Sequence, residues 1–162
     1  VFRDSIMRPI GASDRWSWAG YDNAWIELGG RRVQSVPGGT HWGGGVSIGA
    51  RDQARVGQLL LDGGSYRGQQ ILPAAWVRSM FEPCAIAPFY GRLLWLNRDG
   101  RNFPGASAGS AFMVGAGGHL TWVEPAHDAV VVLRWMNPDH TGGFTRRMAA
   151  ALRAAALTLP PS

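Results

Sequence analysis

The sequence contains no lysine, because all sixteen of its basic residues are arginine. Any mechanism in which a lysine amine activates a serine nucleophile is therefore excluded within these 162 residues. The single cysteine, Cys84, excludes an internal disulfide framework and a cysteine-based metal site. No His-x-x-x-His pair indicates a zinc site, and no apolar run approaches the ~20 residues of a membrane-spanning helix.

Charged residues are also sparse, at 17% of the chain, whereas hydrophobic residues make up 46%. This balance and the length of 162 residues are typical of one globular domain, or of most of one. The net charge of +5 raises the question of a nucleic-acid partner. The arginines are dispersed apart from the pairs Arg31-Arg32 and Arg146-Arg147, so we expect a basic surface and no nucleic acid. Cysteine usage leaves the cellular location open.

The first half of the chain is predicted to contain a hairpin followed by two helices. Ala24–Leu28 and Arg32–Val36 have the pattern of two strands joined around Gly29-Gly30. A helical pattern runs from Arg51 to Asp62, and the segment Ile71–Val77 opens a second helix.

The second half is predicted to hold a sheet closed by a helix. Tyr90–Leu96 has the pattern of a strand, and Ala111–Trp135 that of an antiparallel meander, with Val130–Leu133 as its central, covered strand. The closing helix has an apolar face formed by Phe144, Met148, Ala151, Leu152 and Ala155. The expected fold class is α/β in the broad α+β sense: an antiparallel sheet flanked by helices.

A glycine-rich turn, Gly115-Ala116-Gly117-Gly118, is the most informative feature of the chain. The short apolar strand Ala111–Val114 runs into it, and His119 begins the returning strand. Glycines at a strand end let the backbone approach a ligand closely and leave N–H groups available for an oxyanion. Spacing alone favours a hairpin turn that has no catalytic role, because glycine turns are common.

The stretch from Gly115 to Pro125 resembles the last active-site strand of the penicillin-recognising serine hydrolases. These include class C β-lactamases, DD-peptidases, related esterases and the aminohexanoate-dimer hydrolases. In the last two groups a Gly-x-x-Gly-[Gln/His] turn often replaces the Lys-Thr-Gly of β-lactamases. Three further segments resemble the family in the same order along the chain: Pro9-Ile10-Gly11, Gly43–Gly57 and Ile71–Val77.

The resemblance implies that residues 1–162 are the C-terminal portion of one such domain. The family's chemistry starts from a Ser-x-x-Lys nucleophile, which this sequence lacks, so we expect the nucleophile-bearing N-terminal part to be missing. Phe2, Ile6 and Met7 share a helix face with no capping residue before them, and the chain is therefore expected to begin inside a helix. By itself the chain is expected to be inactive.

The same resemblance implies a function and partners. The intact enzyme would hydrolyse an amide or ester bond of a small molecule through an acyl-serine intermediate, without a cofactor or metal. The partners expected are that substrate and the missing N-terminal half of the domain. A different class of function also stays open: eight tryptophans are compatible with a non-catalytic module that binds a peptide or glycan through a Trp-rich loop.

The site residues follow from the resemblance, position by position. The residue after the motif's first glycine, Ala116, would supply an oxyanion donor from its backbone N–H, flanked by Gly115 and Gly117. His119 occupies a position where the family often has glutamine, so it is expected to contact the substrate pocket. Met113 stands where lysine or histidine is usual, which argues against recognition of a substrate carboxylate in the manner of β-lactamases.

Two further candidates lie in the Trp-rich and Gly-rich stretches. His41 and Trp42 are predicted substrate-binding residues at a pocket edge, with a core tryptophan and an exposed histidine as the equally weighted alternative. Tyr21-Asp22-Asn23 matches the family's Tyr-x-Asn motif, but it follows the Pro9-Ile10-Gly11 turn that the motif should precede. We interpret it as a chance match beside a strand whose Trp25 and Ile26 belong to the core.

Overall fold

The computed structural model describes residues 1–19, 25–34 and 45–158. Its strands are β1 (Ser17–Ala19), β2 (Trp25–Leu28), β3 (Arg31–Gln34), β4 (Gly45–Ser47), β5 (Ser65–Tyr66), β6 (Gln69–Gln70), β7 (Trp95–Leu96), β8 (Ala111–Gly115), β9 (His119–Glu124) and β10 (Ala129–Leu133). Its helices are α1 (Ala50–Leu61), α2 (Ala74–Met80) and α3 (Thr141–Thr158), with short helical turns η1 (Arg3–Met7), η2 (Pro125–His127) and η3 (Pro138–His140).

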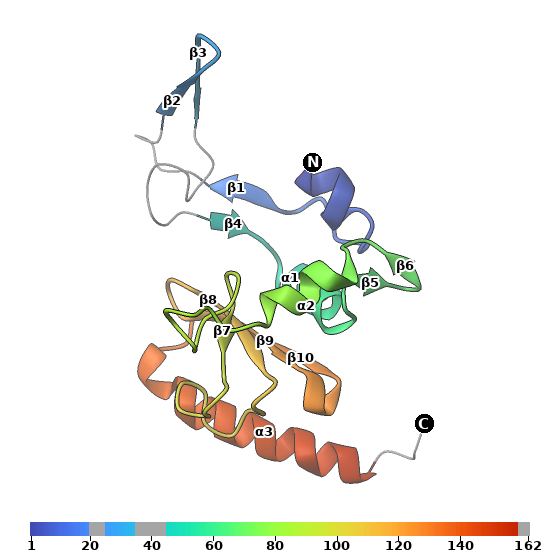
Figure 1. Ribbon diagram of the computed structural model, residues 1–162, viewed down its shortest axis with the longest axis vertical. Coiled ribbons are helices and arrows are strands. Elements are labelled where there is room, and N and C mark those ends of the chain that lie inside the picture. The colour runs from blue at the N-terminus through green and yellow to red at the C-terminus, as the bar shows by residue number, and fades with distance from the viewer. Residues whose placement is uncertain (20–24, 35–44, 159–162) are drawn as a thin grey trace.

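A four-stranded antiparallel sheet in the order β10-β9-β8-β7 forms the centre of the fold. β8 and β9 pair from Ala111↔Val123 to Gly115↔His119, and β9 continues to pair with β10 on its other side. Helix α3 crosses one face of this sheet, and α1 lies on the opposite face with α2 beside it (Figure 1). The antiparallel sheet flanked by helices that the sequence predicts is therefore present.

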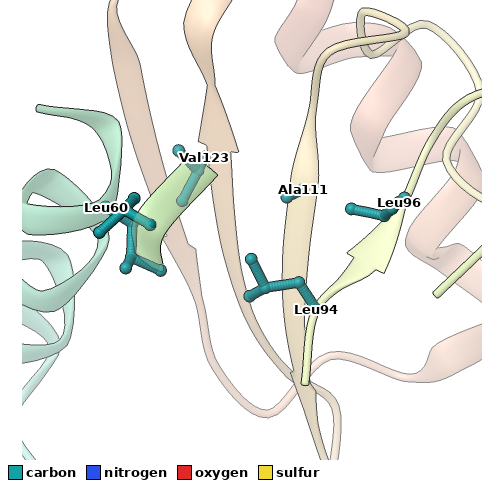
Figure 2. Packing of buried hydrophobic residues seen from close by; sticks show 6 residues of the cluster. Leu60, Leu94, Leu96, Ala111 and Val123 are labelled. Carbon is teal, nitrogen blue, oxygen red and sulfur yellow. The ribbon is translucent and has the colours of Figure 1, made fainter. Parts of the chain in front are cut away.

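Each face of the sheet buries its own apolar cluster. On the α1 side, Leu60 packs with Val123 of β9, Ala111 of β8 and the leucines Leu94 and Leu96 around β7 (Figure 2). On the α3 side the cluster is mainly aromatic and consists of Phe103, Phe112, Leu120, Trp122 and Ala149. Alternate residues of β8 and β9 serve the two clusters, as the two-residue period of a strand requires.

Helix α1 reaches the sheet because Gly57 has no side chain. A Cβ at position 57 would lie 2.6 Å from Val130 Cγ1 and 3.0 Å from Thr121 Cγ2. Leu59 and Leu60 are buried on this helix, as its predicted apolar periodicity requires. Gln53 adds a polar contact by donating a hydrogen bond from Nε2 to Thr121 Oγ1 at 2.8 Å.

Asp52 fastens the N-terminal segment to α1. Its carboxylate accepts hydrogen bonds from the N–H and hydroxyl of Ser13, and it pairs with Arg55 at 2.6 Å. Burial by itself would raise the pKa of Asp52, but the hydrogen bonds from Ser13 and Arg55 outweigh it and the pKa lies below its ordinary value. The segment that holds η1 and β1 is thereby connected to the helix that covers the sheet.

The sheet order corrects the prediction for Val130–Leu133. This run is β10, a half-buried strand at the edge of the sheet, whereas the buried central strand is β9. Within the described residues no strand pairs with the outer side of β10. Its apolar residues are explained by α1 and α3, which cover its two faces while leaving its edge open.

The buried face of α3 and the length of β7 also differ from the sequence prediction. The buried side of α3 carries Thr145 and Ala149, with Met148 and Leu152 packed beside them, whereas the predicted Ala151 and Ala155 are exposed. The observed buried face is therefore rotated from the predicted one. The prediction relied on alanines, and alanine is small enough to occur on either side of a helix. The segment Tyr90–Leu96 is mostly turn, and only Trp95 and Leu96 form a strand.

The hairpin of β2 and β3 is confirmed, but its burial is not. Gly29 and Gly30 connect the two strands with φ values of +58° and +72°, which glycine adopts without strain. Trp25 is exposed and Ile26 is half-buried, so these two residues are not part of the core. Figure 1 shows the hairpin at the end of the molecule opposite α3.

A buried carboxylate, Glu124, holds the polar loop before β8 against the end of β9. Its side chain is 1% exposed and accepts hydrogen bonds from the N–H and hydroxyl of Ser107, from Ser110 Oγ at 2.8 Å and from the Ala126 N–H at 3.1 Å. Trp122 Nε1 donates in turn to Ser110 Oγ at 3.1 Å. Burial alone would raise the pKa of Glu124, yet these donors outweigh it and hold the pKa below its ordinary value of 4.5.

Replacing Glu124 with glutamine is expected to destabilise the fold by about 1–3 kcal/mol at pH 7, because an NH2 group then faces buried donors. The lowered pKa means that the carboxylate contributes its stability above pH 4.5 and loses it as the pH falls through the folded-state value. The difference between wild type and Glu124→Gln in urea unfolding should therefore shrink in acid. Glu82→Gln, at an exposed position, is the control and should stay within about 0.5 kcal/mol of wild type. A constant difference from pH 7 to pH 3 would contradict this role.

Candidate functional site

The turn between β8 and β9 has a backbone that only glycine fits. Gly115 pairs with His119, and the three residues between them make the turn, with φ of +79° at Gly117 and +74° at Gly118. A Cβ at position 118 would overlap the carbonyl oxygen of Met136, and the Met136 N–H donates to the Gly118 carbonyl at 3.2 Å. The segment that follows β10 therefore holds this turn from outside.

The direction of the Ala116 N–H follows from the pairing of β7 and β8. The Asn97 N–H donates to the Ser110 carbonyl at 3.2 Å, so the backbone of Ser110 faces β7. Backbone groups alternate along a strand, and those of Phe112, Val114 and then Ala116 face the same way. The pairing of β7 with β8 ends at Phe112. Past that point, no group among the described residues accepts a hydrogen bond from the Ala116 N–H.

A cavity of about 640 Å³ lies beside the turn, on the α1 side of the sheet. Its walls come from the end of β8, from β4 and from the start of α1, and they are mostly apolar. Arg134 also lines this cavity; it donates from Nη1 to the Ile48 carbonyl, and its buried Nε has no hydrogen-bond partner in the described part of the chain. A second cavity of about 240 Å³ lies next to the same turn and is lined by Phe103, Leu133 and Pro138.

His119 lines both cavities. Its ring meets the Trp135 ring edge-to-face, with 4.4 Å between the centroids. The Nδ1 atom of His119 is buried and has no hydrogen-bond partner among the described residues. A molecule that enters the cavity can form a hydrogen bond with this ring nitrogen. That bond would compensate the cost of burying the nitrogen away from water.

The structure brings four of the predicted site residues together. Gly115, Ala116, Gly117 and His119 form one continuous wall next to the two cavities. The predicted pair His41 and Trp42 lies outside the described residues, and so does the segment 21–23 with its Tyr-x-Asn match.

The structure adds site residues that the sequence analysis did not select. Arg134 and Trp135 line the cavity from the segment just after β10, next to His119 at the start of β9. The apolar run before them gave no indication of this, because it identifies a strand but not its neighbour. The register of β9 and β10 was needed to find them.

Two serines in the described part of the chain match a Gly-x-Ser-x-Gly pattern, at Ser47 and Ser107. A nucleophile elbow needs its serine on a sharp, strained turn between a strand and a helix. Ser47 instead pairs with Ser17 within the β1–β4 ladder, and the hydroxyl of Ser107 is bound to Glu124. Neither serine has a positive φ.

The described ranges contain neither a cluster of metal ligands nor a membrane-spanning helix. There, no group of three histidine, cysteine, aspartate or glutamate side chains is arranged to hold a metal ion. No helix among residues 1–19, 25–34 and 45–158 is long and apolar enough to cross a bilayer.

Comparison with known proteins finds similarity to a hydrolase. It is 32% identical over 111 residues to the 6-aminohexanoate-dimer hydrolase of Paenarthrobacter ureafaciens, a match that covers 59% of this chain and 26% of that protein. No protein-family profile matches the chain. The chain thus spans about a quarter of the length of the curated relative that it matches.

Two solved structures resemble the fold. A candidate 6-aminohexanoate-dimer hydrolase from Bacillus anthracis superposes with a TM-score of 0.54 at 26% identity, covering 72% of this chain and 31% of that one. Unliganded simvastatin synthase (LovD) from Aspergillus terreus superposes with a TM-score of 0.55 at 16% identity, covering 93% and 48%. The second likeness concerns the fold alone.

Proposed function

We propose that this chain is a C-terminal portion of a serine β-lactamase-like hydrolase and that it completes the oxyanion hole of that enzyme. Its similarity to 6-aminohexanoate-dimer hydrolases supports the proposal. The intact enzyme cleaves an amide or ester bond through an acyl-serine intermediate. The Ala116 N–H donates to the oxyanion, and Gly115, Gly117 and His119 form the adjoining wall. The serine belongs to an N-terminal part of the same domain.

The observation that carries this proposal is the unpaired N–H of Ala116 at the end of β8. It lies beyond the last pairing with β7, on a turn fixed by left-handed glycines and by the Met136 N–H. A donor that is held in place before the reaction pays no reorganisation cost when charge develops on the carbonyl oxygen. Removal of one such donor typically lowers the rate ~10²–10³-fold.

The surroundings of the turn support an N-terminal partner segment. The cavity of about 640 Å³ is bounded by the turn, α1 and β4, and its lining is mostly apolar. The outer edge of β10 has no pairing strand among the described residues. An apolar hollow and an unpaired strand edge both favour cover by further chain. In the intact enzyme the nucleophile-bearing segment would cover the cavity, and an additional strand would pair with the outer edge of β10.

The proposed substrate is a small-molecule amide or ester. The relative from Paenarthrobacter is named for the dimer of an amino acid, which is joined by an amide bond. Cleavage needs the serine oxygen to attack the carbonyl carbon, the negative charge to collect on the carbonyl oxygen, and the amine or alcohol to leave with a proton. This portion stabilises the charge, whereas the proton transfers belong to the N-terminal part.

A fluorophosphonate probe is expected to leave the 162-residue chain unlabelled. Neither Ser47 nor Ser107 has the geometry of an activated nucleophile, and no lysine is present to activate one. The measurement is intact-mass spectrometry after incubation, with trypsin as a labelled control. Stoichiometric labelling of one serine would contradict the assignment of the nucleophile to another segment.

The alternative function, a non-catalytic peptide- or glycan-binding module, has one observation in its favour. Trp18 and Trp25 are exposed near the hairpin end of the molecule. Trp16, by contrast, is buried against Phe2, so the Trp-rich stretch is not one continuous binding face. The sequence encoded upstream of Val1 distinguishes the two functions. A Ser-x-x-Lys followed by a Tyr-x-Asn within one domain would support the hydrolase. An unrelated domain would support the binding module.

A further inference from the structure

Trp135 combines two features that folding alone does not favour. It lies two residues beyond Leu133, the last residue of β10, and has a φ of +61°, a left-handed conformation that costs free energy for a residue with a large side chain. Its side chain is nevertheless 77% exposed, so little apolar burial offsets that cost. Strained backbone that persists without a packing reason is concentrated at functional sites.

The left-handed conformation changes the face to which the ring belongs. Val130 of β10 faces α1, where it contacts Gly57, so Val132 and Arg134 face α1 as well. Continued alternation would place Trp135 on the α3 side. The positive φ instead brings its ring to the larger cavity and against His119, which shares the α1 side with Thr121.

The same conformation positions the contacts that hold the glycine turn. The ring atom Trp135 Cζ3 would lie 3.6 Å from a Cβ at position 117, so the ring lies against this part of the turn. The next residue, Met136, donates its N–H to the Gly118 carbonyl at 3.2 Å. The left-handed residue therefore has its own ring against Gly117 and is followed directly by the residue whose N–H donates to Gly118.

We propose that Trp135 is a positioning residue that braces the Gly115–His119 turn and thereby fixes the direction of the Ala116 N–H. The inference rests on the proposed function, because the oriented N–H matters only if it binds an oxyanion. Trp135 acts through His119, Gly117 and Gly118, not on the reacting atoms. A displacement of a catalytic donor by about 1 Å is enough to lower a rate by as much as ~10²-fold.

The chain offers a matched control for the strain. Leu93 also has a left-handed backbone, with φ of +63°, and is 81% exposed, but it does not line either cavity described here. Glycine at position 135 or at position 93 relieves the same backbone strain. Only Trp135→Gly also removes the ring that lies on the turn. Trp135→Phe keeps an aromatic ring at that position and serves as the rescue variant.

The first test asks whether Trp135 stabilises the Gly115–His119 turn, and it does not require catalytic activity. Amide exchange at Met136 and the NMR resonances of the His119 ring are followed in the 162-residue chain. Trp135→Gly is expected to accelerate exchange at Met136 at least 10-fold and to shift the His119 ring protons, whereas Leu93→Gly changes neither. Unchanged exchange and unchanged His119 resonances in Trp135→Gly would overturn the proposal. If the chain alone gives no dispersed spectrum, the same exchange is measured by mass spectrometry in the enzyme assembled with its N-terminal part.

The second test uses ester hydrolysis by the assembled enzyme. Trp135→Gly is expected to lower kcat ~10-fold or more with little change in KM, and Trp135→Phe to recover most of that loss. A raised KM with kcat unchanged would overturn the positioning role, because the ring would then bind substrate directly. Normal kcat in Trp135→Gly would overturn it as well while leaving the proposed function intact. A wild-type assembly that neither hydrolyses ester nor reacts with fluorophosphonate would refute the proposed function, and the brace would then be judged on exchange at Met136 alone.

Discussion

Ala116→Pro in the enzyme assembled with its nucleophile-bearing part is expected to lower kcat/KM at least ~10²-fold. Proline has no N–H, so the donor proposed for the oxyanion is removed while the position stays occupied. Ala116→Ser keeps the N–H and changes only a small side chain at the end of the turn, and it should retain most of the activity. The measurement is the hydrolysis of one ester by both variants, with the fold compared by circular dichroism.

Proline also restricts the backbone at position 116. A loss of activity in Ala116→Pro could therefore come from this restriction as well as from the missing N–H. A backbone ester in place of the amide between Gly115 and Ala116 removes the same N–H without a ring. We expect this substitution to lower kcat/KM by a similar factor. Full activity in the ester variant would contradict the oxyanion role of Ala116, whatever the result with proline. Tyr21→Phe should leave activity nearly unchanged, because its Tyr-x-Asn match is interpreted as fortuitous.

Gly118→Ala is expected to cost about 3 kcal/mol or more of folding free energy. Alanine at this position has a left-handed backbone, and its Cβ overlaps the Met136 carbonyl oxygen, so either the turn or the segment after β10 must move. The overlap involves backbone atoms, which cannot relieve it by a change of rotamer. Urea unfolding followed by fluorescence gives the magnitude.

Gly63→Ala is the matched control for this change. Gly63 follows α1 with a φ of +62°, and a Cβ there would have nothing within 4 Å. It therefore carries the backbone strain without the overlap and should cost about 1 kcal/mol. Equal losses in the two variants would mean that strain alone explains Gly118, and the close packing of Met136 on the turn would have no energetic weight.

Local features of this fold were predictable from the sequence because they depend on neighbouring residues. The turn at Gly29-Gly30 and the turn after β8 need a positive φ, which glycine tolerates and other residues rarely do. The helix over Ala50–Leu61 follows from the spacing of its apolar residues. The site turn itself, including Ala116 and His119, was located in the same way.

Tertiary contacts decided what the sequence could not. The run Val130–Leu133 has the composition of a central strand, yet it is an edge strand, because pairing partners are chosen by the whole chain and not by the run itself. The local sequence identifies Glu124 only as a residue of a hairpin turn. Its burial depends on hydrogen bonds donated by Ser107 and Ser110, which lie more than ten residues away.

Trp135 is the sharpest case. No pattern in the sequence assigns a left-handed backbone to a tryptophan, since that conformation is unfavourable for the residue by itself. Its ring lies against Gly117 and His119, and the next residue, Met136, donates a hydrogen bond to Gly118; the register of β9 and β10 brings these groups together. The sequence alone thus determined where the glycine-rich turn lies and which family it resembles, because the glycine positions that define both are visible in the local sequence. The groups that hold the turn in place were decided only by the packed structure, because strand register and not local sequence brings Trp135 and Met136 next to the turn.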